Sequence, residues 1–221
     1  MNLKSIFIFL FVFILTNSVI ISQNRDFVVG AAVGFYGVHI NGEINEMYSS
    51  SNGTLWGNGG LSIALNVKRD FTKNVYGAFE LRAIQKGSIY EFVTFYGTQA
   101  FEVIKLRYIE IPVLVGVKIN LNKRYLLAET GFAYARMISS KMLVNDLKQW
   151  DVSHKLNNFK PNELSWIVNL KYPIIKNEKL LIGLRVSHSL FSIHSIYKLY
   201  NFDYGIELYY LFNRNVKRPN R

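Results

Sequence analysis

Four histidines are the side chains in this chain best suited to acid–base chemistry: His39, His154, His188 and His194. His188 also has serine neighbours, which are Ser187, Ser189 and Ser192. Asp146 or Asp151, from an earlier polar segment, would complete a serine–histidine–acid set. Such a triad is defined by its geometry and not by nearness in the sequence. A simpler interpretation puts His188 on the outer face of a strand, so we predict no catalytic residue and no enzymatic activity.

The sequence contains no pattern that indicates a metal or cofactor site. A metal site needs His, Asp or Glu side chains that converge, and nothing fixes the spacing of His188 and His194 around the loop that they flank. The chain contains no cysteine, which excludes thiolate ligands, disulfides and a cysteine nucleophile. The absence of cysteine also fits an oxidising compartment such as the periplasm. We predict neither a metal site nor a cofactor.

The formal net charge of +11 raises the question of nucleic-acid binding. Lysine and arginine are scattered along the chain, however, and the one tight cluster is the C-terminal tail 213–221. The basic residues of this tail are Arg214, Lys217, Arg218 and Arg221. No recognition helix or RNA-binding motif accompanies them. We therefore predict no nucleic-acid partner.

Residues 1–22 have the features of a secretory signal peptide. Lys4 precedes an apolar run from Ile6 to Leu15, and a small residue follows at a plausible cleavage point, Ser22. The competing interpretation is a retained membrane anchor. The apolar run is shorter than the roughly 20 residues that a spanning helix needs, and we prefer cleavage. The predicted organisation is a signal peptide at 1–22, a β-domain at 23–212 and the basic tail.

Apolar and polar residues alternate along most of the mature chain, and this period of two is typical of strands. In the clearest case, odd-numbered positions from Ile109 to Ile119 form an apolar row that opposes Glu110 and Lys118. The same pattern predicts eight strands, at 26–40, 54–69, 74–87, 103–119, 124–138, 163–174, 179–191 and 199–212.

Ionisable residues occupy the face opposite the apolar row in most of these strands. In a soluble sandwich this face meets water, whereas in a membrane barrel it faces the lumen. Three features favour the barrel: short turns alternate with long connections, aromatic residues stand at strand ends, and both signs of charge occur on the polar face. We predict a lumen network with a structural role, made of Glu80, Arg82, Glu110, Lys118, Glu129, Arg185, Asp203 and Glu207.

The predicted fold is therefore an all-β, eight-stranded antiparallel up-and-down transmembrane β-barrel. It must be closed, because an open edge would leave unpaired backbone groups in lipid. Side chains fill the interior of a barrel of this size, so we expect no wide pore. Because proline removes a ladder donor, we also expect a bulge that directs Glu110 and Pro112 into the lumen. The long connections are predicted at 41–53, 88–102, 139–162 and 192–198.

The segment Leu106–Leu114, with its Ile-Glu-Ile-Pro core, resembles a segment of the PorT-like outer-membrane β-barrel family. Glu80-Leu81 followed by Lys86-Gly87 resembles the strand that precedes it. Two features depart from the family pattern. The family often has Gly-Pro in the fifth strand, where this chain has Gly131-Phe132, and outer-membrane proteins often end on an aromatic residue, whereas here nine residues follow Phe212. The resemblance implies a small barrel in the bacterial outer membrane, with a role in type IX secretion for some relatives. It transfers no catalytic or binding residue.

Three hypotheses about function follow. The leading one is a non-enzymatic structural, adhesion or secretion-associated barrel, surrounded by outer-membrane lipid and able to contact a protein partner through its extracellular loops. The connection 139–162 is the candidate segment for such contact, since loops often carry function. The alternatives are a barrel that binds a small apolar ligand, against which the charged lumen argues, and an enzyme with its site at the rim. The sequence does not specify the partner or the oligomeric state.

Overall fold

A computed structural model describes residues 27–43, 54–93, 99–121, 124–146, 149–154, 158–175 and 179–212. The predicted signal peptide and the basic tail lie outside these residues. The strands are β1 (Phe27–Gly42), β2 (Thr54–Asp70), β3 (Val75–Val93), β4 (Gln99–Leu121), β5 (Arg124–Asp146), β6 (Gln149–His154), β7 (Asn162–Pro173), β8 (Leu180–Ser189) and β9 (Leu199–Leu211). The described residues contain no helix long and apolar enough to span a membrane.

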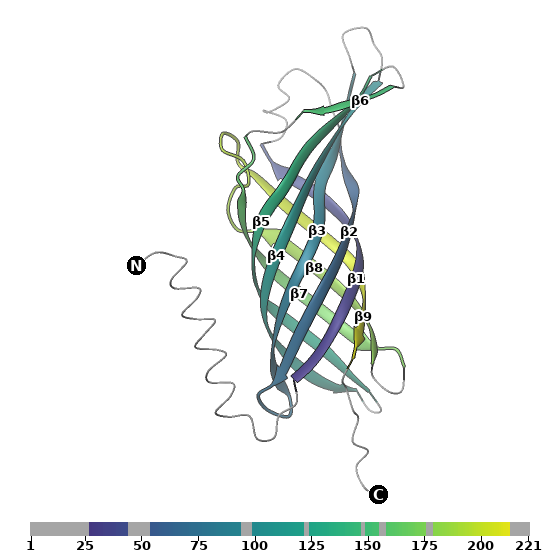
Figure 1. The fold of residues 1–221 in the computed structure, drawn as a ribbon, viewed down its shortest axis with the longest axis vertical. Helices are drawn as coiled ribbons and strands as arrows, with labels where there is room; N and C mark the ends of the chain where they lie inside the picture. The colour runs from purple at the N-terminus through teal and green to yellow at the C-terminus, as the bar shows by residue number, and fades with distance from the viewer. Residues whose placement is uncertain are drawn as a thin grey trace, which may run out of the picture.

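Eight of the nine strands close into a ring, which confirms the predicted fold class. The hydrogen-bonded order runs from β4 through β3, β2, β1, β9, β8 and β7 to β5, and β5 also pairs with β4. All the pairings are antiparallel. Figure 1 shows this ring as a tall, tilted barrel. β6 pairs with the upper part of β5 and stands above the ring.

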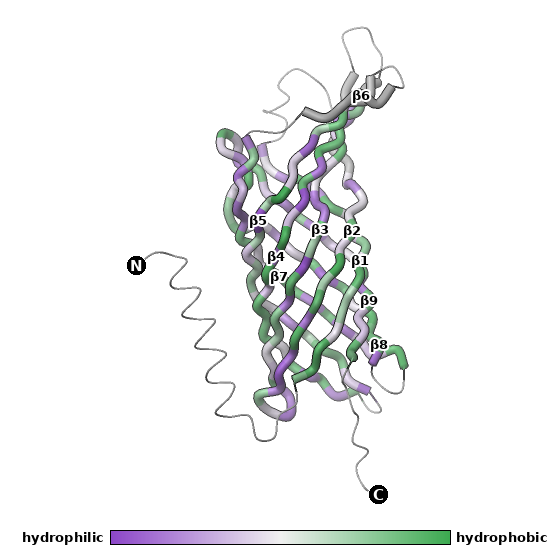
Figure 2. Tube along the Cα trace, in the orientation of Figure 1, coloured by the Kyte–Doolittle hydropathy of each residue, from purple (hydrophilic) through white to green (hydrophobic). Residues whose placement is uncertain are grey.

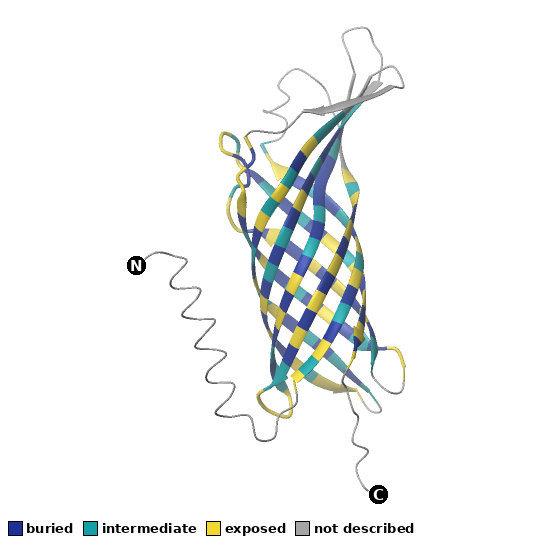
Figure 3. Cartoon of the chain, in the orientation of Figure 1, coloured by how far each residue is buried: buried dark blue, intermediate teal, exposed yellow. Residues whose placement is uncertain are grey.

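The sequence alternation separates an inner and an outer face, as expected. Along β4, Val113 and Val115 are 60% and 56% exposed, whereas Leu114 between them is 1% exposed. Figure 3 shows the same alternation of buried and exposed positions on every strand of the ring, and Figure 2 shows that the hydropathy alternates with it. The outward side chains are largely apolar and the charged ones are buried. This inverts the arrangement of a soluble protein and matches a barrel surrounded by lipid.

Three consecutive strands are much longer than a bilayer requires. β3 has 19 residues, and β4 and β5 have 23 each, whereas a transmembrane strand needs roughly 9–11. The predicted long connections at 88–102 and 139–162 are therefore wrong, because most of their described residues belong to β3, β4, β5 and β6. We call the projecting parts, residues 88–93, 99–105, 139–146 and 149–154, the extracellular extension, since long connections of such barrels face outward and short turns face the periplasm.

The predicted bulge at Pro112 is also wrong. Glu110 and Pro112 both face the lumen, but the register between β3 and β4 is the same on either side of Pro112. A missing proline donor interrupts the ladder without inserting a residue, so no shift is needed. The register of β4 with β5 shifts instead between Arg107 and Tyr108, where Ile138 is the extra residue.

Candidate functional site: the charged interior

The middle of the barrel is filled by ionisable side chains. Seven of the eight predicted lumen residues are at most 4% exposed; they are Glu80, Arg82, Glu110, Glu129, Arg185, Asp203 and Glu207. Lys118 is placed differently, since it lies near the end of β4 and its Nζ is 2.7 Å from Asp70. Lys118 thus belongs to the rim with the short turns and not to the central cluster.

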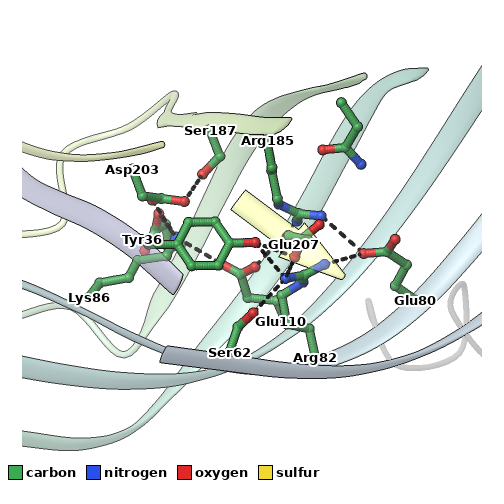
Figure 4. A network of polar contacts seen from close by, with 12 residues as sticks. Tyr36, Ser62, Glu80, Arg82, Lys86, Glu110, Arg185, Ser187, Asp203 and Glu207 are labelled. Atoms are coloured by element: carbon green, nitrogen blue, oxygen red, sulfur yellow. Dashed lines mark hydrogen bonds and ion pairs between the residues drawn. The ribbon is translucent and has the colours of Figure 1, made fainter. Parts of the chain in front are cut away.

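Arg82 lies at the centre of the first group of contacts (Figure 4). Its guanidinium lies 2.9 Å from Glu80 and also contacts the carboxylate of Glu207. Arg82 Nη1 donates to the hydroxyl of Ser62 at 2.9 Å and to that of Tyr36 at 2.8 Å. The five residues come from β1, β2, β3 and β9, so one side chain ties together four neighbouring strands.

Arg185 joins this group to the next. Its guanidinium lies 3.0 Å from Glu80 on one side and 3.7 Å from Glu110 on the other. Because β8 carries Arg185 and β4 carries Glu110, these contacts cross the lumen rather than follow the sheet.

Lys86 faces three carboxylates. Its Nζ lies 2.7 Å from Glu110, 3.0 Å from Glu163 and 3.5 Å from Asp203. Hydroxyl and amide groups surround the same carboxylates: Ser187 donates to Asp203 at 2.7 Å. Glu163 accepts from Ser189 and Asn201, at 2.8 Å each.

A third group extends toward the end with the short turns. Lys171 Nζ lies 2.7 Å from Glu129, which also accepts hydrogen bonds from Tyr76 at 2.9 Å and Asn169 at 3.0 Å. Lys171 is 3.5 Å from Glu80, so this group joins the first. Its ammonium also stands 4.0 Å from the ring centroid of Tyr209.

These contacts form one connected network of six carboxylates and four cations. The carboxylates are Glu80, Glu110, Glu129, Glu163, Asp203 and Glu207, and the cations are Arg82, Lys86, Lys171 and Arg185. A buried charge is tolerated only where opposite charges and hydrogen bonds compensate it. The network therefore compensates its own buried charges and links strands that face one another across the lumen.

Apolar layers lie on both sides of the network. On the side of the short turns, Tyr125, Leu127 and Leu181 belong to one buried cluster. On the extracellular side, Phe159 and Ile193 from the connections pack into a second cluster with Ile104 and other inward side chains. The interior thus consists of a charged layer between two apolar ones.

Sequence reasoning left five ionic or amide members out of the predicted set: Lys86, Glu163, Lys171, Asn169 and Asn201. Each follows the inward parity of its strand, so alternation was the signal that could have found them. The tyrosines Tyr36, Tyr76 and Tyr209 were missed for a different reason. A tyrosine suits either face, and only its neighbours show whether its hydroxyl serves a carboxylate.

The histidine–serine arrangement does not form. His188 is exposed on the outer face of β8, where it stacks on Tyr200 with ring centroids 6.0 Å apart. Ser187 and Ser189 point into the lumen and bond to Asp203 and Glu163. The side chains of Asp146 and Asp151 lie outside the described ones. Among the described residues, no group of His, Asp and Glu has the arrangement of a metal site.

His194 stabilises the connection between β8 and β9. The residue is 4% exposed, and its Nδ1 accepts hydrogen bonds from the backbone amides of Ile196 at 3.3 Å and Tyr197 at 3.1 Å. Burial and the nearby Lys160 ammonium hold the pKa of His194 below its usual value. The neutral imidazole is therefore the form that this connection needs.

A closed antiparallel ring with an apolar exterior and a charged interior defines a small transmembrane β-barrel. The chain belongs to the outer membrane protein β-barrel domain family, whose model matches residues 21–195. Its location is the bacterial outer membrane. No curated protein matches the chain.

Several solved outer-membrane proteins are similar in structure. Ail, the attachment invasion locus protein of Yersinia pestis, is 11% identical with a TM-score of 0.47, over 84% of this chain and 98% of Ail. Neisserial surface protein A is 8% identical with a TM-score of 0.45, over 86% of this chain and all of that one. OprG of Pseudomonas aeruginosa is 9% identical with a TM-score of 0.44, over 85% and 96%.

Proposed function

We propose that this protein is a non-enzymatic, non-conducting barrel that anchors the extracellular extension for contact with another protein, in a structural, adhesion or secretion-associated role. The observation that carries this proposal is the filled interior. Ten ion-paired side chains cross the lumen, and apolar clusters pack above and below them. A barrel filled in this way holds its strands rigidly and leaves the projecting hairpins as the part available to a partner.

The extension supports the second half of the proposal. β4 exceeds the length of a transmembrane strand by about 12 residues, which at about 3.3 Å per residue and a tilt of about 45° is roughly 28 Å of additional height. The β3–β4 pairing continues to Val93 and the β4–β5 pairing to Asn145, which makes the extension a sheet. A sheet of this kind is a suitable platform for partner contact through its face or its edge strand β6.

The Ile-Glu-Ile-Pro segment supports a finer placement among PorT-like barrels, and with it the secretion-associated role. Glu110 is buried in the network and Pro112 is buried beside it. Glu110 and Pro112 thus belong to the interior of the barrel, so the motif supports membership of this group of barrels through its packing and not through a partner contact.

The ligand-binding alternative is less well supported. A small apolar ligand would need an apolar cavity, whereas the middle of this lumen holds paired charges. At the extracellular mouth, the inward apolar residues pack with Phe159 and Ile193 of the connections.

Two measurements test the proposal. In planar bilayers, the purified barrel should give no stable conductance steps, and steps that persist across preparations would contradict a filled lumen. In cells, a photocrosslinking residue at Phe101 on the extension should yield a protein adduct of defined mass. The matched position Val115, which is 56% exposed on the membrane-spanning wall, should yield none. Equal adducts at both positions, or none at Phe101, would argue against a partner on the extension.

A further inference from the structure

The outward face of β4 and β5 carries four cations at the point where the apolar wall ends. Arg107, Arg136 and Lys141 are exposed and Lys105 is half-buried. None of the four has an ion pair or side-chain hydrogen bond to any residue that the structure describes. We call Lys105, Arg107, Arg136 and Lys141 the β4–β5 cation patch.

Within this patch, two like charges face each other directly. Lys105 and Lys141 are register partners across β4 and β5, and both point outward. Side chains in such positions have Cβ atoms roughly 5 Å apart, and like charges there destabilise the pair. Arg107 follows on the same face roughly 7 Å along β4. An arrangement of this kind is stabilised when an anion stands between the cations.

The patch begins at the edge of the membrane-spanning wall. On β4, the outward row changes from Lys105 and Arg107 to Ile109 within one step of the pleat. On β5, Arg136 is followed in the outward row by Tyr134 and then Phe132. Tyrosine at the end of an apolar row marks the interfacial belt of a membrane protein. The cations therefore lie at the depth of the lipid headgroups.

Neighbouring strands cross the same boundary with neutral side chains. The register partner of Arg107 on β3 is Gln85, and that of Arg136 on β7 is Asn162. Lys105 is opposite Gly87 on β3, which carries no side chain. The positive charge is thus concentrated on β4 and β5 at this level of the barrel, and is not spread evenly as the net charge of +11 alone would suggest.

The described carboxylate on the outward face of the adjacent strand is too far away to neutralise the patch. Glu91 lies four residues along β3 from Gly87, or roughly 13 Å at the rise of a strand. Phosphate is the anion that clustered Arg and Lys bind well, since guanidinium and ammonium groups donate charge-assisted hydrogen bonds to its oxygens.

From these observations we infer that the β4–β5 cation patch binds the phosphate groups of lipid headgroups in the outer leaflet. The barrel wall supplies the apolar surface for the acyl chains, and the patch supplies the countercharge immediately above it. This inference concerns the boundary between the membrane-spanning wall and the extension, and its ligand is a lipid, so it does not depend on a protein partner.

The test compares two lipids that differ only in phosphate. The full barrel is purified from outer membranes and mixed with diphosphorylated lipid A or with enzymatically dephosphorylated lipid A, and retained lipid is measured by native mass spectrometry. The wild-type protein should retain the phosphorylated form preferentially. Lys105→Gln with Lys141→Gln should weaken this retention roughly 30-fold, since each cation near an anionic surface contributes roughly fivefold.

The matched control removes two exposed charges that lie away from the patch. Lys73, in the turn between β2 and β3, is exposed, and Lys198, between β8 and β9, is 75% exposed, so Lys73→Gln with Lys198→Gln should retain lipid as the wild type does. Lys105→Arg with Lys141→Arg should also retain it. The shift in gel mobility on boiling verifies that each variant is folded.

Three outcomes would overturn the inference. One is equal retention of the two lipids by the wild type, and another is equal weakening in both glutamine pairs. The third is equally tight binding of inositol hexakisphosphate that depends on the patch, which would make it a site for soluble polyanions. If the glutamine pair fails to fold, the single variants Lys105→Gln and Lys141→Gln carry the same comparison.

Discussion

Replacing Lys86 by methionine removes the cation that faces three buried carboxylates. Lys86 Nζ is 2.7 Å from Glu110, 3.0 Å from Glu163 and 3.5 Å from Asp203, and its side chain is 1% exposed. Arg185 remains 3.7 Å from Glu110 after the change, but Glu163 and Asp203 have no other ion-pair partner among the described residues. Methionine keeps much of the side-chain volume, so the loss of charge dominates. Breaking a buried pair in this way should lower the free energy of unfolding by roughly 3–5 kcal/mol.

The assay is denaturant unfolding of the barrel in phosphatidylcholine vesicles, followed by tryptophan fluorescence and by gel mobility without boiling. Lys198→Met is the control, because this lysine is 75% exposed and 3.9 Å from Glu43. Its effect should stay within about 0.5 kcal/mol. Adding Asp203→Asn to Lys86→Met removes one uncompensated charge and should recover roughly 1–3 kcal/mol. A Lys86→Met variant as stable as the control, or one destabilised further by Asp203→Asn, would refute the reasoning.

Three further predictions follow from other parts of the barrel. Gly87 has a φ of +139°, and a Cβ there would meet the Ile104 carbonyl oxygen at 1.9 Å, so Gly87→Ala should lower unfolding stability by roughly 1–3 kcal/mol. Val115→Arg puts a charge in the lipid-facing row and should cost roughly 2–4 kcal/mol in vesicles, whereas Val115→Leu should be neutral. The pKa of His194 is lowered in the folded protein, so His194 binds a proton more readily when the connection between β8 and β9 is unfolded. The stability of the folded connection should therefore be fully present above about pH 6.5 and should decrease as the pH falls. Hydrogen exchange at the two amides that donate to its Nδ1 should show this, after correction for intrinsic rates, and His194→Ala should abolish it.

Parity along a strand separates inward from outward positions, but it does not predict which inward side chains meet. Glu80 and Arg82 are two residues apart on one strand, so their contact follows from local geometry. The pairing of Arg185 with Glu80 depends on how far each strand is staggered around the ring, and this stagger is a property of the closed sheet. Lys86 and Glu163 illustrate the same limit, since 77 residues separate two groups that lie 3.0 Å apart.

The error in the strand ends has a physical cause that itself carries information. Alternation arises because lipid and lumen differ in polarity, and it fades where both faces of a sheet meet water, although the backbone ladder continues. The expected third strand ended at 87, the fourth began at 103 and the fifth ended at 138, whereas the ladders run on to Val93, Gln99 and Asp146. These expected ends lie beside Lys105 and Arg107 in the register of the sheet. The point where the pattern fades therefore locates the membrane boundary from hydropathy alone, and the cations locate it at the same level from charge.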